Sequence, residues 1–187
     1  MRCPPFNPPR RIIIDNMVVE VDDSGWGDLV GGAVIVMRRV GTNERYVGEV
    51  SIETFQGHAF REKAYLPPVL KIVREGIEAL RIPKKEPIHV CTGYILSEVR
   101  KALTNEGYSV VPSRLTGVTQ EFAEEEYVKH LARLGVGTPD QARHLRGFDS
   151  FLAWVLRDVD KRELFVKTGW KAWLRLKGEE KIETGKA

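Results

Sequence analysis

Apolar residues in the first third of the chain come in short runs with alternating polar positions, which is the period of a β-strand. Residues 17–21 form one run, residues 31–37 a second, and residues 45–55 a third in which Glu and Ser occupy alternate positions. Turn residues separate the runs, with Ser and Gly at 24–27 and Gly-Thr-Asn-Glu at 41–44. β-branched runs bounded by such residues are typical of paired strands. We therefore predict three strands, most simply an antiparallel meander.

After Gly57 the period lengthens to that of a helix. Apolar residues recur at three- and four-residue spacing over 69–80. Pro67 and Pro68 precede this segment and suit a first helical turn, and Pro83 ends it. The pattern predicts one amphipathic helix directly after the meander.

The remaining elements alternate between strand and helix. Strands are predicted at 87–91 and 108–115, with a short helix at 97–107 between them that Ser97 would cap. A helix at 119–134, with Thr119 as its N-cap, and a helical region at about 140–159 follow. Strand-helix alternation favours parallel pairing of the later strands with the first. We predict an α/β fold whose five-stranded mixed sheet is antiparallel over its first three strands, then parallel, and is flanked by helices.

By composition the chain divides into three parts. Residues 1–10 contain four prolines and are expected to form an extended arm. Residues 11–160 carry the strands and helices of one domain. Residues 161–187 are a basic segment with two tryptophans, expected to dock on that domain and to end in a disordered tail. A chain of 187 residues with 42% hydrophobic content can bury a core without disulfides.

Composition also argues against several classes of protein. No stretch approaches the length of a membrane span, and the proline-rich start lacks the apolar core of a signal peptide. Cys3 and Cys91 give neither a disulfide framework nor metal-ligand spacing, and Cys91, in an apolar run, is expected to be a buried thiol. A cytoplasmic location is the expectation, and few Asn and Gln beside many Glu, Lys and Arg indicate a heat-loving source. The net charge of +3 is too small to indicate nucleic-acid binding by itself.

The acids at the end of the first predicted strand are the first candidate site. Asp22 and Asp23 follow the apolar run directly. A carboxylate at the end of a central strand is held by the sheet while its head reaches the rim, where it could bind a divalent metal. Asp and Ser after a strand are also common turn residues that bond their own backbone, and Asp23 suits that role better than metal binding.

The phrase Val-Asp-Asp-Ser-Gly at 21–25 resembles the first-strand Asp-Gly-Ser pattern of the ribonuclease H-like superfamily of nucleases. The predicted order of elements is similar to that fold as well. The resemblance implies a metal-dependent nuclease acting on structured DNA or RNA, with Mg²⁺ or Mn²⁺ as cofactor. It also implies that Asp22 is the central metal ligand.

Three further segments extend the resemblance. Ser-Arg-Leu-Thr-Gly at 113–117 and the stretch at 146–156 are similar to the branch that contains Holliday-junction resolvases. In that branch an aspartate opening the late helix binds metal, which here implies Asp149. Phe-Arg-Glu at 60–62 is similar to the endonuclease V branch, and implies Glu62 as a third ligand and catalytic residue beside Asp22.

The chain also departs from the superfamily's pattern. Thr92 follows the fourth strand where an acid is usual, and Pro112 and Ser113 replace the acids of the resolvase-like branch. A threonine can contact a metal-bound water but supplies no charge. The alternative is therefore a non-catalytic nucleic-acid-binding or protein-interaction module that keeps the fold without a complete acidic site.

The C-terminal segment carries the second candidate site. Aromatic and basic residues alternate there and could stack on bases and neutralise phosphates. Tryptophans at this spacing also serve to dock a chain end on a core, with the basic groups solvated around them. The candidate nucleic-acid-binding residues are Lys167, Trp170, Lys171, Trp173 and Arg175.

Overall fold

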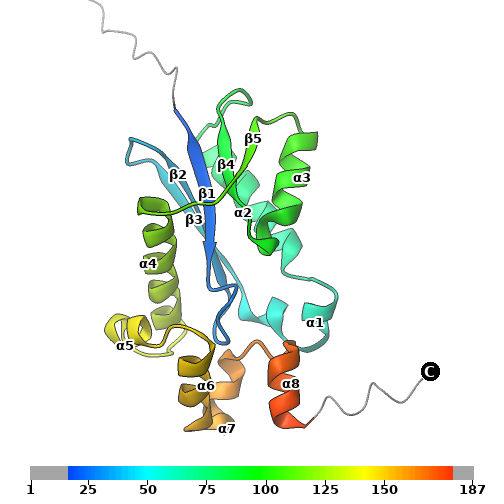
Figure 1. Cartoon of the computed structure of the whole chain (residues 1–187), viewed down its shortest axis with the longest axis vertical. Helices are drawn as coiled ribbons and strands as arrows, with labels where there is room; N and C mark the ends of the chain where they lie inside the picture. The colour runs from blue at the N-terminus through cyan, green and yellow to red at the C-terminus, as the bar shows by residue number, and fades with distance from the viewer. Residues whose placement is uncertain (1–16, 179–187) are drawn as a thin grey trace, which may run out of the picture.

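The computed structural model describes residues 17–178, which form a layered α/β fold around a central sheet (Figure 1). The predicted arm at 1–10, the apolar run at 11–16 and the tail at 179–187 lie outside the described residues. Every helix within 17–178 is too short or too polar to pass through a bilayer.

Five strands form one mixed sheet in the order β3-β2-β1-β4-β5, with β1 at its centre. β1 (Val19–Ser24), β2 (Ala33–Arg39) and β3 (Arg45–Val50) pair antiparallel. β4 (Ile88–Cys91) lies parallel to β1, and β5 (Val110–Ser113) lies parallel to β4. The predicted α/β class and the mixed five-stranded sheet are confirmed.

Helices cover both faces of this sheet and gather beyond one end of it (Figure 1). The 3-10 helices are η1 (Ile52–Phe55), η2 (Tyr94–Leu96) and η3 (Glu163–Phe165). The α-helices are α1 (Gly57–Arg61), α2 (Leu66–Ala79), α3 (Ser97–Asn105), α4 (Val118–Arg133), α5 (Pro139–His144), α6 (Phe148–Leu156), α7 (Val159–Arg162) and α8 (Lys171–Lys177).

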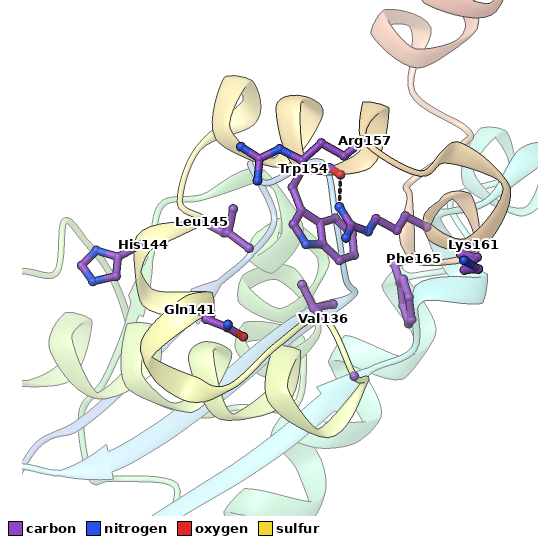
Figure 2. A pocket seen from close by; sticks show the side chains of 10 residues that line it. Val136, Gln141, His144, Leu145, Trp154, Arg157, Lys161 and Phe165 are labelled. Carbon is purple, nitrogen blue, oxygen red and sulfur yellow. Dashed lines mark hydrogen bonds between the residues drawn. The ribbon is translucent and has the colours of Figure 1, made fainter.

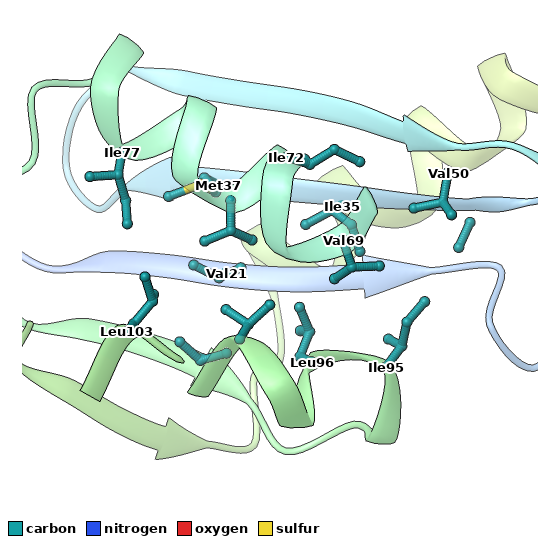
Figure 3. Packing of buried hydrophobic residues seen from close by; sticks show 14 of the residues in the cluster. Val21, Ile35, Met37, Val50, Val69, Ile72, Ile77, Ile95, Leu96 and Leu103 are labelled. Atoms are coloured by element: carbon teal, nitrogen blue, oxygen red, sulfur yellow. The ribbon is translucent and has the colours of Figure 1, made fainter. Parts of the chain in front are cut away.

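One face of the sheet packs against α2 and α3. Val21, Ile35 and Met37 point from β1 and β2 toward Val69 of α2 and Leu103 of α3, as Figure 3 shows. All five side chains are fully buried. Each such side chain contributes roughly 1.5–3 kcal/mol by leaving water. The helical period of the sequence therefore places α2 correctly.

The opposite face of the sheet packs against α4. Val34 and Val36 alternate with the β2 residues of the first face, as the two-residue period of a strand requires. They join a second cluster with Ala123, Tyr127 and Leu131 of α4, all fully buried. Because β1 follows the same alternation, Glu20, Asp22 and Ser24 lie on the α4 face.

The predicted N-caps at Ser97 and Thr119 are wrong. Leu96 and Gly117 are the residues at the helix starts, and neither helix has a side-chain cap. The Thr119 hydroxyl instead donates to the Glu20 carboxylate and accepts a hydrogen bond from Arg38 Nε at 2.8 Å. A buried hydroxyl facing an acid and a cation of the sheet bonds to them rather than to its own helix, so Thr119 fixes α4 on β1.

Two predicted boundaries are also corrected. The third strand ends at Val50 rather than at residue 55, because Ser51 accepts a hydrogen bond from the Glu53 amide and starts η1. The helical region at 140–159 is split, since Gly147 takes φ +84° between α5 and α6. An L side chain rarely adopts that conformation, and glycine does so without penalty.

The C-terminal segment is part of the same fold. The Lys167 amide donates to the Leu29 carbonyl at 2.9 Å, and the Gly31 amide donates to the Phe165 carbonyl at 2.8 Å. These bonds pair residues 165–167 with the chain leading into β2, around the bridge between Val30 and Val166. The segment thereby backs the loop that follows Asp22 and Asp23.

Candidate metal centre

Two carboxylates and one thiol converge where β1 and β4 end. The side-chain ligand atoms of Asp22, Asp23 and Cys91 all lie within 4.8 Å of one another. Among residues 17–178 this is the one group of three or more acidic, Cys or His side chains close enough to share a metal ion. Asp22, the predicted central metal ligand, belongs to this group.

The parallel register of the sheet explains this convergence. Val21 of β1 pairs with Val90 of β4, and the next residue on each strand is Asp22 or Cys91. Parallel neighbours bring their carboxyl ends to the same edge of a sheet, where ligands commonly bind. The polar end of a buried strand thus faces an opening rather than the core.

This end of the sheet opens into a cleft of about 720 Å³, the metal cleft. Its walls come from β1 and its following loop, from the ends of β4 and β5, and from α4. Besides Asp22, Asp23 and Cys91 it is lined by Ser24, Gly25, Trp26, Gly27, Asp28, Thr92, Arg114, Leu115, Gln120, Glu124 and Arg146.

Burial sets the electrostatics of both aspartates. Desolvation raises the pKa of Asp22, although its carboxylate accepts hydrogen bonds from the Cys91 thiol and, at 2.9 Å, from the Asp23 amide. Desolvation and then the neighbouring Asp22 charge raise the pKa of Asp23 to about 7, with Lys167 opposing that shift. Within 17–178 neither carboxylate forms a salt bridge. Bound divalent cations stabilise ionised carboxylates, so a buried acid beside a half-buried one, neither of them in a salt bridge, forms a candidate cation site.

Cys91 contributes a hydrogen-bond donor to this group. Burial raises the pKa of its thiol to about 11, and the hydrogen bond to Asp22 and the two acidic charges act in the same direction. The thiolate is the form that binds metals and attacks electrophiles. The two carboxylates beside this thiol supply oxygen ligands of the kind that Mg²⁺ and Mn²⁺ take.

Arg146 borders the acidic side of the cleft. Its Nε lies 3.4 Å from Asp28 Oδ2, and its guanidinium lies 5.2 Å from the centre of the Tyr127 ring. Asp28 in turn accepts a hydrogen bond from the Gly147 amide at 3.0 Å. Asp28 is therefore already engaged, which leaves Glu124 as the other acid that lines the cleft with Asp22 and Asp23.

Lys167 lies beneath the loop that follows Asp23 and is fully buried. Its ammonium donates to the Gly25 carbonyl and, at 3.2 Å, to the Trp26 carbonyl, and it lies 4.7 Å from the centre of the Phe55 ring. Desolvation lowers the pKa of this lysine to about 7, against the charges of Asp28 and Asp23. Lys167 thus fixes the loop from below.

Glu62 and Asp149 are not brought to Asp22, which corrects their prediction as ligands. Glu62 ends α1 with a 66% exposed side chain and lies 3.4 Å from the His58 imidazole. Asp149 lies exposed in the first turn of α6. Neither residue lines the metal cleft or belongs to the cluster of Asp22.

Two of the predicted nucleic-acid-binding residues are also corrected. Lys167 is fully buried, and Trp173 is 2% exposed and donates to Glu163 at 3.2 Å, so neither side chain can contact nucleic acid. Trp170 is half-buried, with the Lys167 ammonium 5.3 Å from its ring centre. Lys171 and Arg175 of α8 are exposed.

Sequence reasoning assigned Asp23 to the turn rather than to the metal, and it missed Cys91, Glu124 and Arg146 as residues of the cleft. The register of β4 beside β1 was the signal for Cys91, because strands predicted to be parallel end at the same edge. Glu124 and Arg146 carry no local signal, since the packing of α4 and of the α5–α6 connection brings them to the cleft. Comparison with known proteins adds no assignment: no family model matches the chain, and no curated protein matches it.

The pKa of Asp23 gives the fold a pH dependence that can be measured. A carboxyl whose pKa is raised from 3.8 to about 7 binds a proton more tightly when folded, so its contribution is complete below about pH 4 and is lost as pH rises through 7. In EDTA, Asp23→Asn is expected to gain roughly 2–4 kcal/mol of unfolding free energy relative to wild type between pH 4.5 and pH 7.5. Urea unfolding at both pH values measures this difference. Asp140→Asn, at an exposed position of α5, is the control, and an equal gain in both variants would contradict the assignment.

Proposed function

We propose that the protein is a metal-dependent phosphodiester hydrolase, a nuclease that acts on DNA or RNA. The observation that carries the proposal is a pair of carboxylates, buried Asp22 and half-buried Asp23, that form no salt bridge within residues 17–178 and lie at the open end of two parallel strands. The sheet order and the place of Asp22 near the carboxyl end of the central strand also support the resemblance to the ribonuclease H-like superfamily. A cytoplasmic location belongs to the same proposal.

The chemistry of the donor set fits Mg²⁺ or Mn²⁺. Both ions take oxygen ligands, and Mg²⁺ retains several waters, so a few carboxylates suffice to hold it. Asp22 and Asp23 would bind the ion directly, and Glu124 would contact it from α4. When bound, such an ion activates water and neutralises the charge that develops on the phosphate.

The chain's own residues supply the rest of the site. The Cys91 thiol and the Asp23 amide both donate to Asp22 and hold its carboxylate in one orientation. Arg100 donates to the carbonyls of Cys91 and, at 3.1 Å, Gly93, which fixes the chain just beyond β4. These contacts hold the carboxylate ligands in position, so the side chains of the site would need to move little during catalysis.

Two features of the metal cleft suit a nucleic-acid substrate. Arg114 at the end of β5 and Arg146 before α6 place two guanidinium groups on the walls around the acids, where they could bind phosphates flanking the scissile one. Trp26 lies on the same wall, with its ring centre 5.8 Å from that of Tyr94, which is 48% exposed. Aromatic side chains of this kind stack on bases without sequence preference.

A cleavage panel tests the proposal. Purified protein is incubated with labelled branched DNA, duplex DNA, RNA–DNA hybrid, duplex RNA and single strands, in Mg²⁺, Mn²⁺ or EDTA. Cleavage of at least one substrate in metal, and none in EDTA, is the expected result. Mn²⁺ binding measured by electron paramagnetic resonance reports on the site without requiring the correct substrate. No cleavage together with no Mn²⁺ binding would overturn the proposal.

One observation favours a second candidate, a non-catalytic nucleic-acid-binding module. Thr92 supplies no charge where β4 ends, so the cluster holds two acids and a thiol rather than three acids. Such a module would bind nucleic acid with an affinity that falls as salt rises and does not respond to metal. Filter binding across salt concentrations, with and without Mg²⁺, separates the two candidates.

A further inference from the structure

A second hollow, the aromatic pocket, lies among α5, α6, α7 and the end of α4 (Figure 2). Its volume is about 620 Å³, and it shares no lining residue with the metal cleft. Nothing in the proposed hydrolase activity uses it. It is lined by Gly135, Val136, Gln141, His144, Leu145, Trp154, Arg157, Lys161, Arg162 and Phe165.

Flat and aliphatic groups form the interior of the aromatic pocket. The Trp154 indole lies between Leu145, Val136 and Phe165 in Figure 2. The ring centres of Trp154 and Phe165 are 6.0 Å apart, and their planes are inclined by 53°. Arg162 fixes the indole, because its guanidinium lies 4.4 Å from the ring centre and donates to the Trp154 carbonyl at 2.5 Å. Arg162 therefore covers and fixes one face of the indole, and a planar ligand would stack on the other face.

The charged side chains that line the aromatic pocket are all basic. They are Arg157, Lys161 and Arg162, and His144 lines the pocket as well. Lys161 is paired with Asp158 at 3.0 Å, and Arg162 is held by Trp154. Arg157 is exposed, and within 17–178 its guanidinium has no hydrogen-bond or ion-pair partner; Figure 2 shows it at the edge of the pocket. An unpaired arginine next to an apolar hollow favours a ligand with an anionic end.

We propose that the aromatic pocket binds a nucleoside phosphate, with the base against Trp154 and Phe165 and the phosphate on Arg157 and His144. A volume of about 620 Å³ lies within the range of small-molecule sites. A base provides the planar group that the indole stacks on, and a phosphate matches the fork of an arginine. A fatty acid would lack the flat ring, and a dicarboxylate would leave the apolar walls uncovered. The proposal does not depend on the metal centre.

Calorimetric titration of the full chain in EDTA tests this site. AMP is expected to bind with a dissociation constant between about 10 μM and 1 mM, and adenosine, inorganic phosphate, octanoate and succinate at least about tenfold more weakly. Arg157→Ala is expected to weaken AMP binding about tenfold or more, because a hydrogen bond to a charged group is lost. Trp154→Leu should weaken it similarly. Lys71→Ala, which removes an exposed charge on α2, is the matched control and should bind as wild type does.

Two further arms complete the test. Oligonucleotides with and without a 5′-phosphate, titrated alone and in competition with AMP, distinguish a free nucleotide from the end of a strand as the source of the ligand. Asp22→Asn should bind AMP as wild type does, so failure of the nuclease proposal leaves this result unchanged. Circular dichroism and thermal melting verify that each variant folds. No AMP binding up to about 5 mM, or equal binding by wild type and Arg157→Ala, would overturn the proposal.

Discussion

Asp22→Asn is expected to lower metal-dependent cleavage at least about a hundredfold, because the charge stabilisation that a catalytic metal supplies is worth several kcal/mol. The same substitution should leave the unfolding free energy in EDTA unchanged or raise it at pH 7.5. Burial raises the pKa of Asp22, so its ionised carboxylate destabilises the metal-free fold at that pH, and an amide of the same shape removes that cost. Loss of activity without loss of stability would indicate a functional residue rather than a structural one.

Matched variants make this expectation specific. Glu62→Gln and Asp149→Asn, the two acids that the resemblance implies but the structure places outside the cluster, should each change the cleavage rate less than about threefold. Initial rates at saturating Mg²⁺ and urea unfolding in EDTA are measured for all three variants. If Asp149→Asn abolished cleavage as Asp22→Asn does, α6 would have to approach β1 in the active state, and the ligand set described here would be wrong.

The sheet and the position of Asp22 could be predicted because both follow from local periodicity. Alternating apolar residues set the faces of β1 and β2, and the strand-helix-strand order sets the parallel pairing of β4 and β5. Asp22 comes directly after the apolar run, so it lies near the strand end whatever surrounds it. Its partner Cys91 follows from the same register once β4 is placed beside β1.

The positions of Glu62 and Asp149 could not be predicted from the sequence because they depend on tertiary contacts. The third strand ends early, and η1 and α1 then lead the chain toward the C-terminal segment, where the Gly57 amide donates to Thr168 at 3.1 Å. Glu62 follows that path to the surface. Before α6, the Gly147 amide donates a hydrogen bond to Asp28, whereas the Asp149 side chain is exposed to solvent. Hydrophobic period contains no information about such loop contacts.

Gly25→Ala is expected to destabilise the fold by roughly 2–4 kcal/mol, combining overpacking with left-handed strain. Gly25 takes φ +89°, and a Cβ there would lie 2.2 Å from the Tyr127 ring. That ring cannot move aside easily, because it is fully buried, its hydroxyl donates to the Val30 carbonyl, and Arg146 lies over it. Urea unfolding measures the change, and Mn²⁺ affinity shows whether the displaced loop disturbs Asp22 and Asp23.

Gly27→Ala, two residues further along the same loop, is the matched control for this substitution. A Cβ at Gly27 would meet nothing within 4 Å, and its φ is not left-handed, so a change within about 0.5–1 kcal/mol is expected. Both variants add one methyl group to the same loop. A difference between them therefore shows that the contact of Gly25 with Tyr127, rather than any substitution in the loop, causes the destabilisation. If both variants were equally stable, Tyr127 would not define the floor beneath Gly25. The loop that follows the two carboxylates would then depend on other contacts, such as those that Lys167 makes with the Gly25 and Trp26 carbonyls.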